Sequence, residues 1–533
     1  MSYYLRVEGV NLGNFIMDTN DLSTIRGGGL LLLDSVNLVE ESIRKMLPSP
    51  GKDPLRAARE RLEDVKRRLE ELKKERPPDY KQQKNTLKRE KKRLQGVIRR
   101  LHRLHPSPHP PGLVITKGAS WGLFSLDVDR DTALQIKAKV INTLAEDKNY
   151  RHATFVVDLH PDNGEKNYQR DRDSLQTINR WQQMQGPSLA IPAPEHEVCD
   201  FDKVRPAASE DFSPKEGRHI SASVRCRREY GRRQRQDFYH RVTQLADLAF
   251  TRDLGELGRD PSRGILDGKI AYIYIDGNNF GAWQRGARNP GEQCAFDQAV
   301  RMGREKVLTA ILKRIQDDPA WQYGETQGEK IRLRLETLLW GGDEIIWVVP
   351  AWQGWWLVQT FYELARASIC YPGDTPLRHA TGLVFCHHNA PIRRIDDLAR
   401  RLAENFAKMD RNRNLIAYQV LETFDHAGTN LRGYRQSRIQ GLGDIDHLLV
   451  DADDMEDIES CIRELQTPEI DFPRRKIHQI LYAWRNNDER LAREYEEKLP
   501  EAAQKSLSAL QACFGGRQAH WLHLMDLWDY VSP

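Results

Sequence analysis

The chain has 533 residues, of which 39% are hydrophobic and 30% are charged. This length is too great for a single core and predicts two to four domains, and the hydrophobic content excludes global disorder. No stretch approaches the ~18 consecutive apolar residues of a membrane helix, the first residues lack the layout of a signal peptide, and the scattered cysteines form no disulfide framework. We therefore expect a soluble, cytoplasmic, multidomain protein.

The net charge of +4 hides a strong asymmetry along the chain. Residues 52–105 hold 20 Lys and Arg against 9 Asp and Glu, a net charge of +11, so the rest of the chain carries −7. Such dense basic clusters are typical of proteins that bind RNA or another polyanion, although long solvated helices can have the same composition. A second basic cluster, for which we predict nucleic-acid contacts, contains Arg225, Arg228, Arg232 and Arg233.

Residues 1–160 predict a first domain built of alternating strands and helices. Tyr3, Leu5 and Val7 alternate as in a strand, and an apolar helix follows that we expect to open at 26–29. Once the basic segment is set aside, the order becomes β-α-β-β-α-β, which is the ferredoxin-like order of a palm domain. The later elements are a β-hairpin at 113–126 with the turn Gly118-Ala119-Ser120, a helix at 131–146 and a strand at 153–159.

The basic segment 52–105 carries leucines at sevenfold spacing in two runs, separated by Pro77 and Pro78. This spacing predicts a helical hairpin with an antiparallel coiled-coil seam, inserted in the first palm. The leucines concerned are Leu55, Leu62, Leu69, Leu87, Leu94 and Leu101.

The same order of elements recurs in residues 266–438, which we predict to be a second palm. A buried strand at 271–275 ends at Asp276, and two apolar strands flank the turn Gly341-Gly342-Asp343-Glu344. The remaining elements are helices at 293–317, 356–368 and 394–408, and a strand at 380–386. The predicted fold class is therefore α+β with two ferredoxin-like palms, and residues 439–533 predict a helical C-terminal domain.

Residues 161–265 are predicted to be a linker that is rich in loops at 161–240. The linker contains a set of side chains that could form a degenerate structural zinc site. The spacing fits zinc poorly and no CxxC pair is present, so a polar linker with incidental cysteines remains the alternative. The four candidate ligands are His196, Cys199, His219 and Cys226.

Three carboxylates of the second palm are the candidate catalytic residues. In a ferredoxin-like sheet the strand ending at Asp276 lies beside the hairpin that carries Asp343 and Glu344. Oxygen ligands are those that Mg²⁺ or Mn²⁺ prefers, and a pair of such ions could activate a 3′-hydroxyl and stabilise a pyrophosphate leaving group.

Further residues around the carboxylates are candidates for nucleotide binding. Gly341 and Gly342 allow a tight turn and close approach of a nucleotide. The loop at 277–281 can offer backbone amides to a triphosphate, and we expect Gly277, Asn279 and Phe280 to shape that part of the site. Lys408 is either a charge for the β- and γ-phosphates or an ordinary solvated lysine.

These segments resemble a known family. The strand and loop IAYIYIDGNNFG and the hairpin LLWGGDEIIWVVP resemble the palm of GGDEF-type nucleotide cyclases, and more closely the second palm of the large palm-polymerase subunit of type III CRISPR effector complexes. The segments GNFIMDTNDLSTIRGGGLLLLDSV, CDFDKVRPA and HATGLVFCHHNAPIRRIDDLARRLAENFAKMDRNRN are similar to further parts of that subunit. The resemblance implies ATP as substrate, Mg²⁺ or Mn²⁺ as cofactor, a cyclic oligonucleotide messenger as product, a role in antiviral defence, and RNA and other effector subunits as partners.

The sequence departs from the family pattern in three ways. No HD pair precedes the first palm, so the DNase activity associated with that domain is not expected. The turn reads GGDE where the family typically has GGDD, and the hairpin at 52–105 has no counterpart that we can match. The first palm would be a partner without catalytic carboxylates, because its turn at 118–120 contains no acid.

Two other functions remain open from the sequence. The palm pair could be a catalytically silent RNA-binding scaffold of an RNA-guided complex, although an acidic turn argues against a purely structural role. The protein could also be a stand-alone cyclic dinucleotide synthase, which product size and independence of RNA would distinguish.

Overall fold

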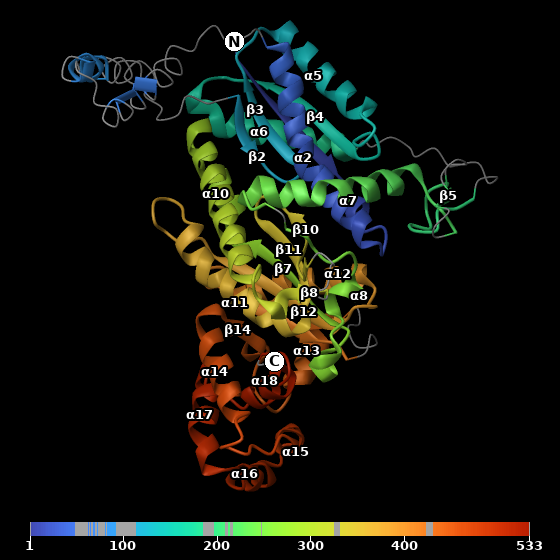
Figure 1. The fold of residues 1–533 in the computed structure, drawn as a ribbon, viewed down its shortest axis with the longest axis vertical. Coiled ribbons are helices and arrows are strands. Elements are labelled where there is room, and N and C mark those ends of the chain that lie inside the picture. Colours follow the sequence, from blue (N-terminus) through green and yellow to red (C-terminus); the bar gives the residue numbers. More distant parts are fainter. Residues whose placement is uncertain are drawn as a thin grey trace.

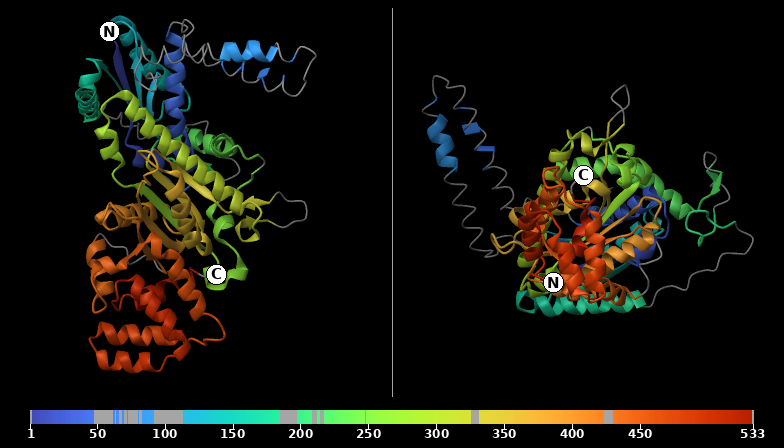
Figure 2. Two further views of the ribbon diagram at one scale, coloured as in Figure 1. Left: turned by 90° about the vertical axis from the view of Figure 1, so that its left-hand side faces the viewer. Right: turned by 90° about the horizontal axis from the view of Figure 1, so that it is seen from below.

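The structure is a computed structural model. It describes residues 2–47, 62, 64–65, 68–69, 72, 80, 83–91, 113–184, 197–207, 212–213, 217–246, 248–324, 331–422 and 430–531. Figure 1 shows an elongated molecule in which the first palm, the second palm and the C-terminal helices follow one another along the long axis, and the turned views in Figure 2 agree. None of the helices in the described ranges combines the length and the apolar character that a membrane span needs.

The first palm contains one antiparallel sheet of four strands in the order β2-β3-β1-β4. On one face Leu5 and Val7 pack against α2 and α5, while on the other face Tyr4 and Leu123 pack against Tyr168 of α6. The elements are β1 (Tyr3–Val10), α2 (Leu22–Met46), β2 (Val114–Lys117), β3 (Trp121–Leu126), α5 (Arg130–Glu146), β4 (Thr154–Pro161) and α6 (Tyr168–Met184). This is the predicted β-α-β-β-α-β order, and it is confirmed.

The second palm repeats that arrangement in four strands of a six-stranded sheet. The order β10-β11-β7-β12 is antiparallel throughout, and β13 and β14 extend the sheet beyond β12. The elements are β7 (Lys269–Gly277), α10 (Pro290–Ile315), β10 (Glu336–Trp340), β11 (Glu344–Pro350), α11 (Ala351–Ser368), β12 (His379–His387), α12 (Ile392–Asn405), β13 (Leu415–Val420) and β14 (Leu449–Asp451). The predicted duplication and the α+β fold class are therefore confirmed.

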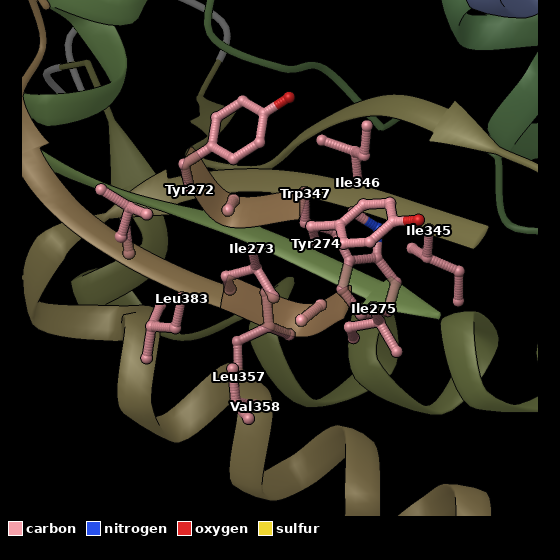
Figure 3. Close-up of a cluster of buried hydrophobic side chains, with 14 of the residues drawn as sticks. Tyr272, Ile273, Tyr274, Ile275, Ile345, Ile346, Trp347, Leu357, Val358 and Leu383 are labelled. Atoms are coloured by element: carbon pink, nitrogen blue, oxygen red, sulfur yellow. The ribbon is translucent and has the colours of Figure 1, made fainter. Parts of the chain in front are cut away.

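Alternating side chains of β7 divide between the two faces of this sheet. Ile273 and Ile275 point toward Leu357 and Val358 of α11 (Figure 3). Tyr272 points to the opposite face, where its hydroxyl donates to Asp396 of α12 over 2.8 Å. The α12 face is also the face of Asp276, since residues two apart in a strand point the same way.

The C-terminal residues form the predicted helical domain. Trp484 and Trp521 are buried there, and both indole N–H groups donate to the carboxylate of Glu496 over 2.8 and 3.0 Å. The helices are α13 (Leu431–Ile439), α14 (Met455–Leu465), α15 (Arg475–Arg485), α16 (Glu489–Glu497), α17 (Gln504–Cys513) and α18 (His520–Leu527).

Two predictions for the segments around α2 need correction. Helix α2 begins at Leu22, where Asp21 caps it by accepting from the Thr24 N–H over 2.8 Å, and not at 26–29. The three glycines lie inside the helix because neighbouring backbones come close: a Cβ at Gly27 would overlap the carbonyl of Arg227, and one at Gly29 would overlap that of Leu338.

The segment 161–240 is also less irregular than predicted. It contains α6 and the 22-residue helix α7 (Ala222–Thr243), which packs across α2. The shorter elements of the chain are α1 (Leu12–Ile16), β5 (Phe212–Ser213), β6 (Arg218–His219), α8 (Leu254–Gly258), α9 (Phe280–Gly286), β8 (Gln322–Tyr323) and β9 (Arg332–Leu333).

Most of the predicted hairpin at 52–105 lies outside the described residues. Four described residues in it form a small buried cluster that joins the two predicted arms, namely Val65, Leu69, Leu72 and Leu87. This contact agrees with a helical hairpin, while Leu55, Leu94 and Leu101 of the predicted seam are not described.

Candidate active site

The three predicted carboxylates meet at one end of the second sheet. Asp276, near the end of β7, pairs in register with Glu344, the first residue of β11. The backbone N–H of Gly277 donates to the carbonyl of Asp343 over 3.1 Å, which ties the hairpin turn to the end of β7. The predicted neighbourhood of strand and hairpin is therefore present.

Asp276 lies in a crowded position with one cation beside it. Its side chain is buried, and its Oδ2 accepts from the ammonium group of Lys408, which also donates to Glu404 over 2.6 Å. Burial, and after it the charge of Asp343, raises the pKa of Asp276 to about 8. Two carboxylates forced together away from water resist ionisation, and such groups favour the arrival of a further cation.

Asp343 is the second acid whose ionisation is opposed. Burial, and next the charge of Glu344, raises its pKa, while Arg304 and Lys408 act in the other direction. Arg304 is a buried residue of α10 that donates to the carbonyl of Gly342 over 2.8 Å and lies over the ring of Trp340. The guanidinium group of Arg304 therefore holds the backbone of the hairpin turn at Gly342.

Glu344 is held by groups of its own. The hydroxyl of Tyr274 donates to its Oε1 over 2.9 Å, and Arg400 of α12 approaches the same oxygen at 3.4 Å. Arg400 also binds Asp396 at 3.0 Å. Burial, and then the charge of Glu344, raises the pKa of Tyr274 and keeps it a hydrogen-bond donor.

The loop after β7 is shaped by its backbone. Asn279 has a left-handed conformation with φ of 62° and directly precedes α9, and the N–H of Asn278 donates to the carbonyl of Arg378 over 2.8 Å. Phe280 is buried against Phe296 and His379, so its ring belongs to the core. The ring of Phe280 is therefore not available to a ligand, and the N–H groups of Gly277 and Asn278 are already bonded within the fold.

The same loop geometry occurs in the first palm. The N–H of Gly9 donates to the carbonyl of Ser120 over 2.8 Å, in the place of the bond from Gly277 to Asp343. Asn11, with φ of 56°, directly precedes α1 as Asn279 directly precedes α9. Both asparagines adopt a conformation that few other side chains tolerate, which indicates that the duplication extends to single backbone positions.

The hairpin turns of the two palms face each other. A Cβ placed on Gly342 would lie 4.0 Å from the Cα of Gly118, and one placed on Gly341 would lie 3.3 Å from the methyl group of Ala119. Between the turns and α10 is a cavity of about 230 Å³, which we call the interpalm cavity. Its lining includes four cations, Lys117, Arg241, Arg301 and Arg304, against the two acids Asp297 and Glu305.

Two of the three predicted carboxylates are placed so that they could hold a divalent cation. Within the described ranges, no three His, Cys, Asp or Glu side chains gather in a way that could hold a metal ion. Mg²⁺ commonly takes only one or two carboxylates and completes its shell with water and phosphate oxygens. Asp276 and Asp343 fit that requirement, whereas Glu344 is engaged by Tyr274 and Arg400.

The predicted zinc ligands are not brought together in the described residues. Cys199 is buried with Ile220 and Val224, whereas the thiol of Cys226 lies 3.5 Å from the carbonyl of Lys148. His219 belongs to β6, and His196 lies outside the described residues. Among the described residues these three candidates form no group that could hold a metal ion, and because His196 is not described the four-ligand zinc site stays a prediction.

The predicted arginine cluster is divided by the geometry of α7. Arg228 and Arg232 line one large cavity, and Arg225 and Arg233 line a separate, smaller one. These two cavities have no lining residue in common. The sequence-based patch is therefore two surfaces and not one.

Sequence reasoning missed the residues that hold the carboxylates in place. Arg304 stands within the apolar stripe of α10 at helical spacing from Val300, Val307 and Leu308, and a charge in such a stripe was the available signal. Tyr274 alternates with Ile273 and Ile275 and had no signal that separates it from a core residue.

Comparison with known proteins gives similarities of structure only. No family model matches the sequence, and no curated protein matches it. The crystal structure of a Csm1-Csm4 cassette in complex with cA4 matches 100% of this chain and 70% of that chain, with 11% identity and a TM-score of 0.49. A Csm1-Csm4 cassette in complex with AMPPNP matches 96% of this chain and 69% of that chain, with 10% identity and a TM-score of 0.44. Csm1 of T. onnurineus matches 100% of this chain and 70% of that chain, with 12% identity and a TM-score of 0.42. No residue of this chain takes a role from these matches.

Proposed function

We propose that this protein is a metal-dependent nucleotidyltransferase of the palm type that converts ATP into a cyclic oligonucleotide, as part of a type III CRISPR or related antiviral system. The observation that carries the proposal is the pair Asp276 and Asp343, which lie on neighbouring elements of the second palm and share a site where ionisation is disfavoured. Acids placed in this way are costly in a fold and typical of functional sites.

The residues present define which groups would hold the ion and the phosphates. Asp276 and Asp343 would bind Mg²⁺ or Mn²⁺, which supplies charge for the transferring phosphate and lowers the pKa of the attacking hydroxyl. On binding, Asp276 would exchange its contact with Lys408, and the released ammonium group could pair with a phosphate. Glu344, held by Tyr274 and Arg400, is assigned to positioning the hairpin.

The reaction would join one ATP to another at each step. The 3′-oxygen of one nucleotide forms a bond to the α-phosphorus of the second, the bond from that phosphorus to the β-phosphate bridge breaks, and pyrophosphate leaves with the electron pair. The hydroxyl proton passes to solvent. The same step between the two ends of the chain closes the ring.

The cations at the interpalm cavity support binding of the triphosphate part of a substrate. Its volume of about 230 Å³ is below the range of whole small-molecule sites, so we assign it phosphate groups and not an entire nucleotide. Arg304 and Arg301 of α10 are the cations from the second palm, and Lys117, which also pairs with Glu40, is one from the first. Both palms would therefore contribute to one substrate site.

Product analysis tests this proposal. The purified protein would be incubated with each nucleoside triphosphate and Mg²⁺ or Mn²⁺, with and without RNA, and the products identified by mass spectrometry. We expect an oligoadenylate or cyclic product that disappears in Asp343→Ala and persists in Asp446→Asn, which changes an exposed acid in the C-terminal region.

The pattern of products also separates the alternatives. Dependence on RNA would favour membership in an RNA-guided complex, and an RNA-independent cyclic dinucleotide would favour a stand-alone synthase. No product under any of these conditions would contradict the enzymatic proposal and favour a scaffold.

A further inference from the structure

A large cavity among the described residues lies away from the carboxylates. It has a volume of about 1270 Å³ and is open to solvent, and it is bounded by the start of α2, by α7, and by the loops at 249–259 and 388–392. Seven arginines and two aspartates are among its lining residues, so we call it the arginine groove. The arginines are Arg26, Arg228, Arg232, Arg235, Arg252, Arg259 and Arg332, and the acids are Asp21 and Asp253.

Three of these arginines form ion pairs within the fold. Arg26 and Arg235 both bind the buried carboxylate of Glu336, at 2.6 and 2.7 Å. Arg332 binds Glu256 at 2.8 Å. These pairs hold α2, α7 and the strands of the second palm together, so the floor of the groove is a fixed structure.

A second part of the charge has a partner at the rim. Arg228 approaches Asp21 at 3.4 Å and lies 4.9 Å from the ring centroid of Phe201. The other acid, Asp253, accepts from the backbone N–H of Glu256 and so caps α8. Asp21 is therefore already paired with a cation, whereas Asp253 uses one carboxylate oxygen as a helix cap.

Three guanidinium groups remain. Arg232, Arg252 and Arg259 are exposed, and among the described residues none of their side chains has an ion pair or a hydrogen bond. They come from three places, α7, the segment before α8 and the segment after it. Unpaired cations that converge on one cavity from separate segments are a binding surface for an anion with several charges.

The volume and the lining of the arginine groove indicate which kind of anion fits it. Sites for single small molecules usually have volumes of about 300–1000 Å³ and are mostly apolar. The arginine groove is larger, is open to solvent and has more polar than apolar lining surface, which fits an extended, charged ligand better than a compact one. The extended anion that matches spaced guanidinium groups is a strand of successive phosphodiesters.

We propose that the arginine groove binds a single-stranded polynucleotide through its phosphates, with Arg232, Arg252 and Arg259 as the contacting groups. The firmly paired Arg26, Arg235 and Arg332 build the wall behind the strand. This site is distinct from the carboxylate site and does not depend on the proposed catalysis, so the two can fail separately.

The test compares two triple variants of the full chain. Arg232→Ala/Arg252→Ala/Arg259→Ala removes the three unpaired cations of the groove. The control Arg130→Ala/Arg180→Ala/Arg490→Ala removes the same charge from exposed positions elsewhere. Binding of a fluorescent 12-nucleotide RNA, and of DNA of the same sequence, would be measured by anisotropy at several salt concentrations.

The expected effect follows from counterion release. For single strands each neutralised phosphate contributes about −0.7 to the slope of log affinity against log salt. Loss of three contacts should therefore reduce the slope by about 2 and lower the affinity about tenfold or more at moderate salt. The control variant should keep the wild-type slope, and both variants should keep the wild-type unfolding temperature.

Two further arms keep the proposal falsifiable. RNA carrying 4-thiouridine should crosslink to peptides from 228–236 and 249–259 in the wild type and lose those crosslinks in the groove variant. Equal salt slopes for the two triple variants together with crosslinks only outside the groove would overturn the proposal. Competition by ATP or tripolyphosphate as strong as that by the 12-nucleotide strands would overturn it too, because the groove would then take a compact phosphate.

Discussion

The two palms have the same strand order but different side chains at the corresponding edge. In the first palm Glu8 near the end of β1 pairs in register with Trp121, the first residue of β3. In the second palm the matching positions hold Asp276 and Glu344. The backbone is thus repeated while the chemistry is not, which illustrates that a function belongs to particular positions on a fold and not to the fold itself.

The acids at the matching positions of the two palms also differ in their burial and in their partners. Glu8 is partly exposed and binds Arg6 at 2.7 Å, and the guanidinium of Arg6 lies over Trp121. Asp276 is 6% exposed and has a second acid, Asp343, close enough to raise its pKa. In the first arrangement a partly exposed glutamate neutralises a buried arginine, whereas in the second two neighbouring acids make ionisation costly, a cost that a bound cation would remove.

The largest effect on the reaction rate should come from changing the acid at the turn of the second palm, in contrast to the residue at the matching position of the first palm. Asp343→Asn is expected to lower the rate of product formation about 10³-fold, since the loss of one ligand of a catalytic metal removes several kcal/mol of transition-state stabilisation. Ser120→Ala changes the corresponding position of the first palm and should leave the rate within about twofold. Rates would be measured as pyrophosphate release.

Equal losses in these two variants would contradict the comparison. They would mean that the turn of the first palm takes part in the chemistry. A loss of folding in Asp343→Asn would be detected by circular dichroism and would remove that variant from the test, in which case Asp343→Glu would replace it.

The next largest effect concerns the ion pairs between the palms. Glu336 at the start of β10 receives Arg26 from α2 and Arg235 from α7, and all three side chains are buried. Glu336→Gln leaves two buried cations without their counter-charge, which should lower the free energy of unfolding by about 3–5 kcal/mol. Urea unfolding followed by tryptophan fluorescence measures this change.

A matched exposed pair provides the control for that measurement. Glu489 and Arg493 are both well exposed on α16, and Glu489→Gln should cost less than about 1 kcal/mol. If both variants cost the same small amount, the palms would not be joined by the buried cluster around Glu336, and they would act as independently folding units.

The third effect is a dependence of stability on pH. Asp276 has a pKa of about 8 in the folded protein against an ordinary value of 3.8, so between these values the folded state holds a proton that the unfolded state has released. Stability therefore falls as pH rises through this window, by up to about 1.4 kcal/mol per pH unit. Asp276→Asn should remove this slope and be more stable than the wild type at pH 8 in metal-free buffer.

Parallel stability curves for the wild type and Asp276→Asn between pH 5 and pH 8 would contradict this expectation. That result would mean that the ammonium group of Lys408 keeps Asp276 ionised throughout the range. The same variant should also lack activity, so a more stable but inactive protein is the combined expected outcome.

The parts that the sequence predicted well are those with strong local signals. Apolar runs lie on both sides of the turn at 341–344, Leu338–Trp340 before it and Ile345–Val349 after it, so both the type and the pairing of the strands could be inferred. The carboxylates followed, because Asp276 ends one such run and Asp343 lies in the turn. Their partners, including Lys408, required the fold, since the contact joins residues 132 positions apart.

The helix α7 shows why the rest could not be predicted. Its buried face includes Arg227, Tyr230, Gly231 and Arg235, and not a stripe of aliphatic residues. Periodicity analysis finds helices by their apolar face, so a face made of arginines with buried partners looks like a polar linker. For the same reason the basic residues of this segment were assigned to one surface, although some are structural and the others lie on two sides.

The smallest effect should come from the acid of the first palm. Glu8→Gln breaks the ion pair with Arg6. The side chain of Glu8 is 26% exposed and that of Arg6 is 10% exposed. We expect a loss of less than about 1 kcal/mol in the free energy of unfolding, because such a partly exposed pair gains little over its hydrated groups. Product formation should stay within about twofold of the wild type, in contrast to the loss expected for Asp276→Asn at the matching position. A Glu8→Gln variant as inactive as Asp276→Asn would show that the first palm also binds the reacting phosphates, and the chemistry would then belong to both halves of the duplication.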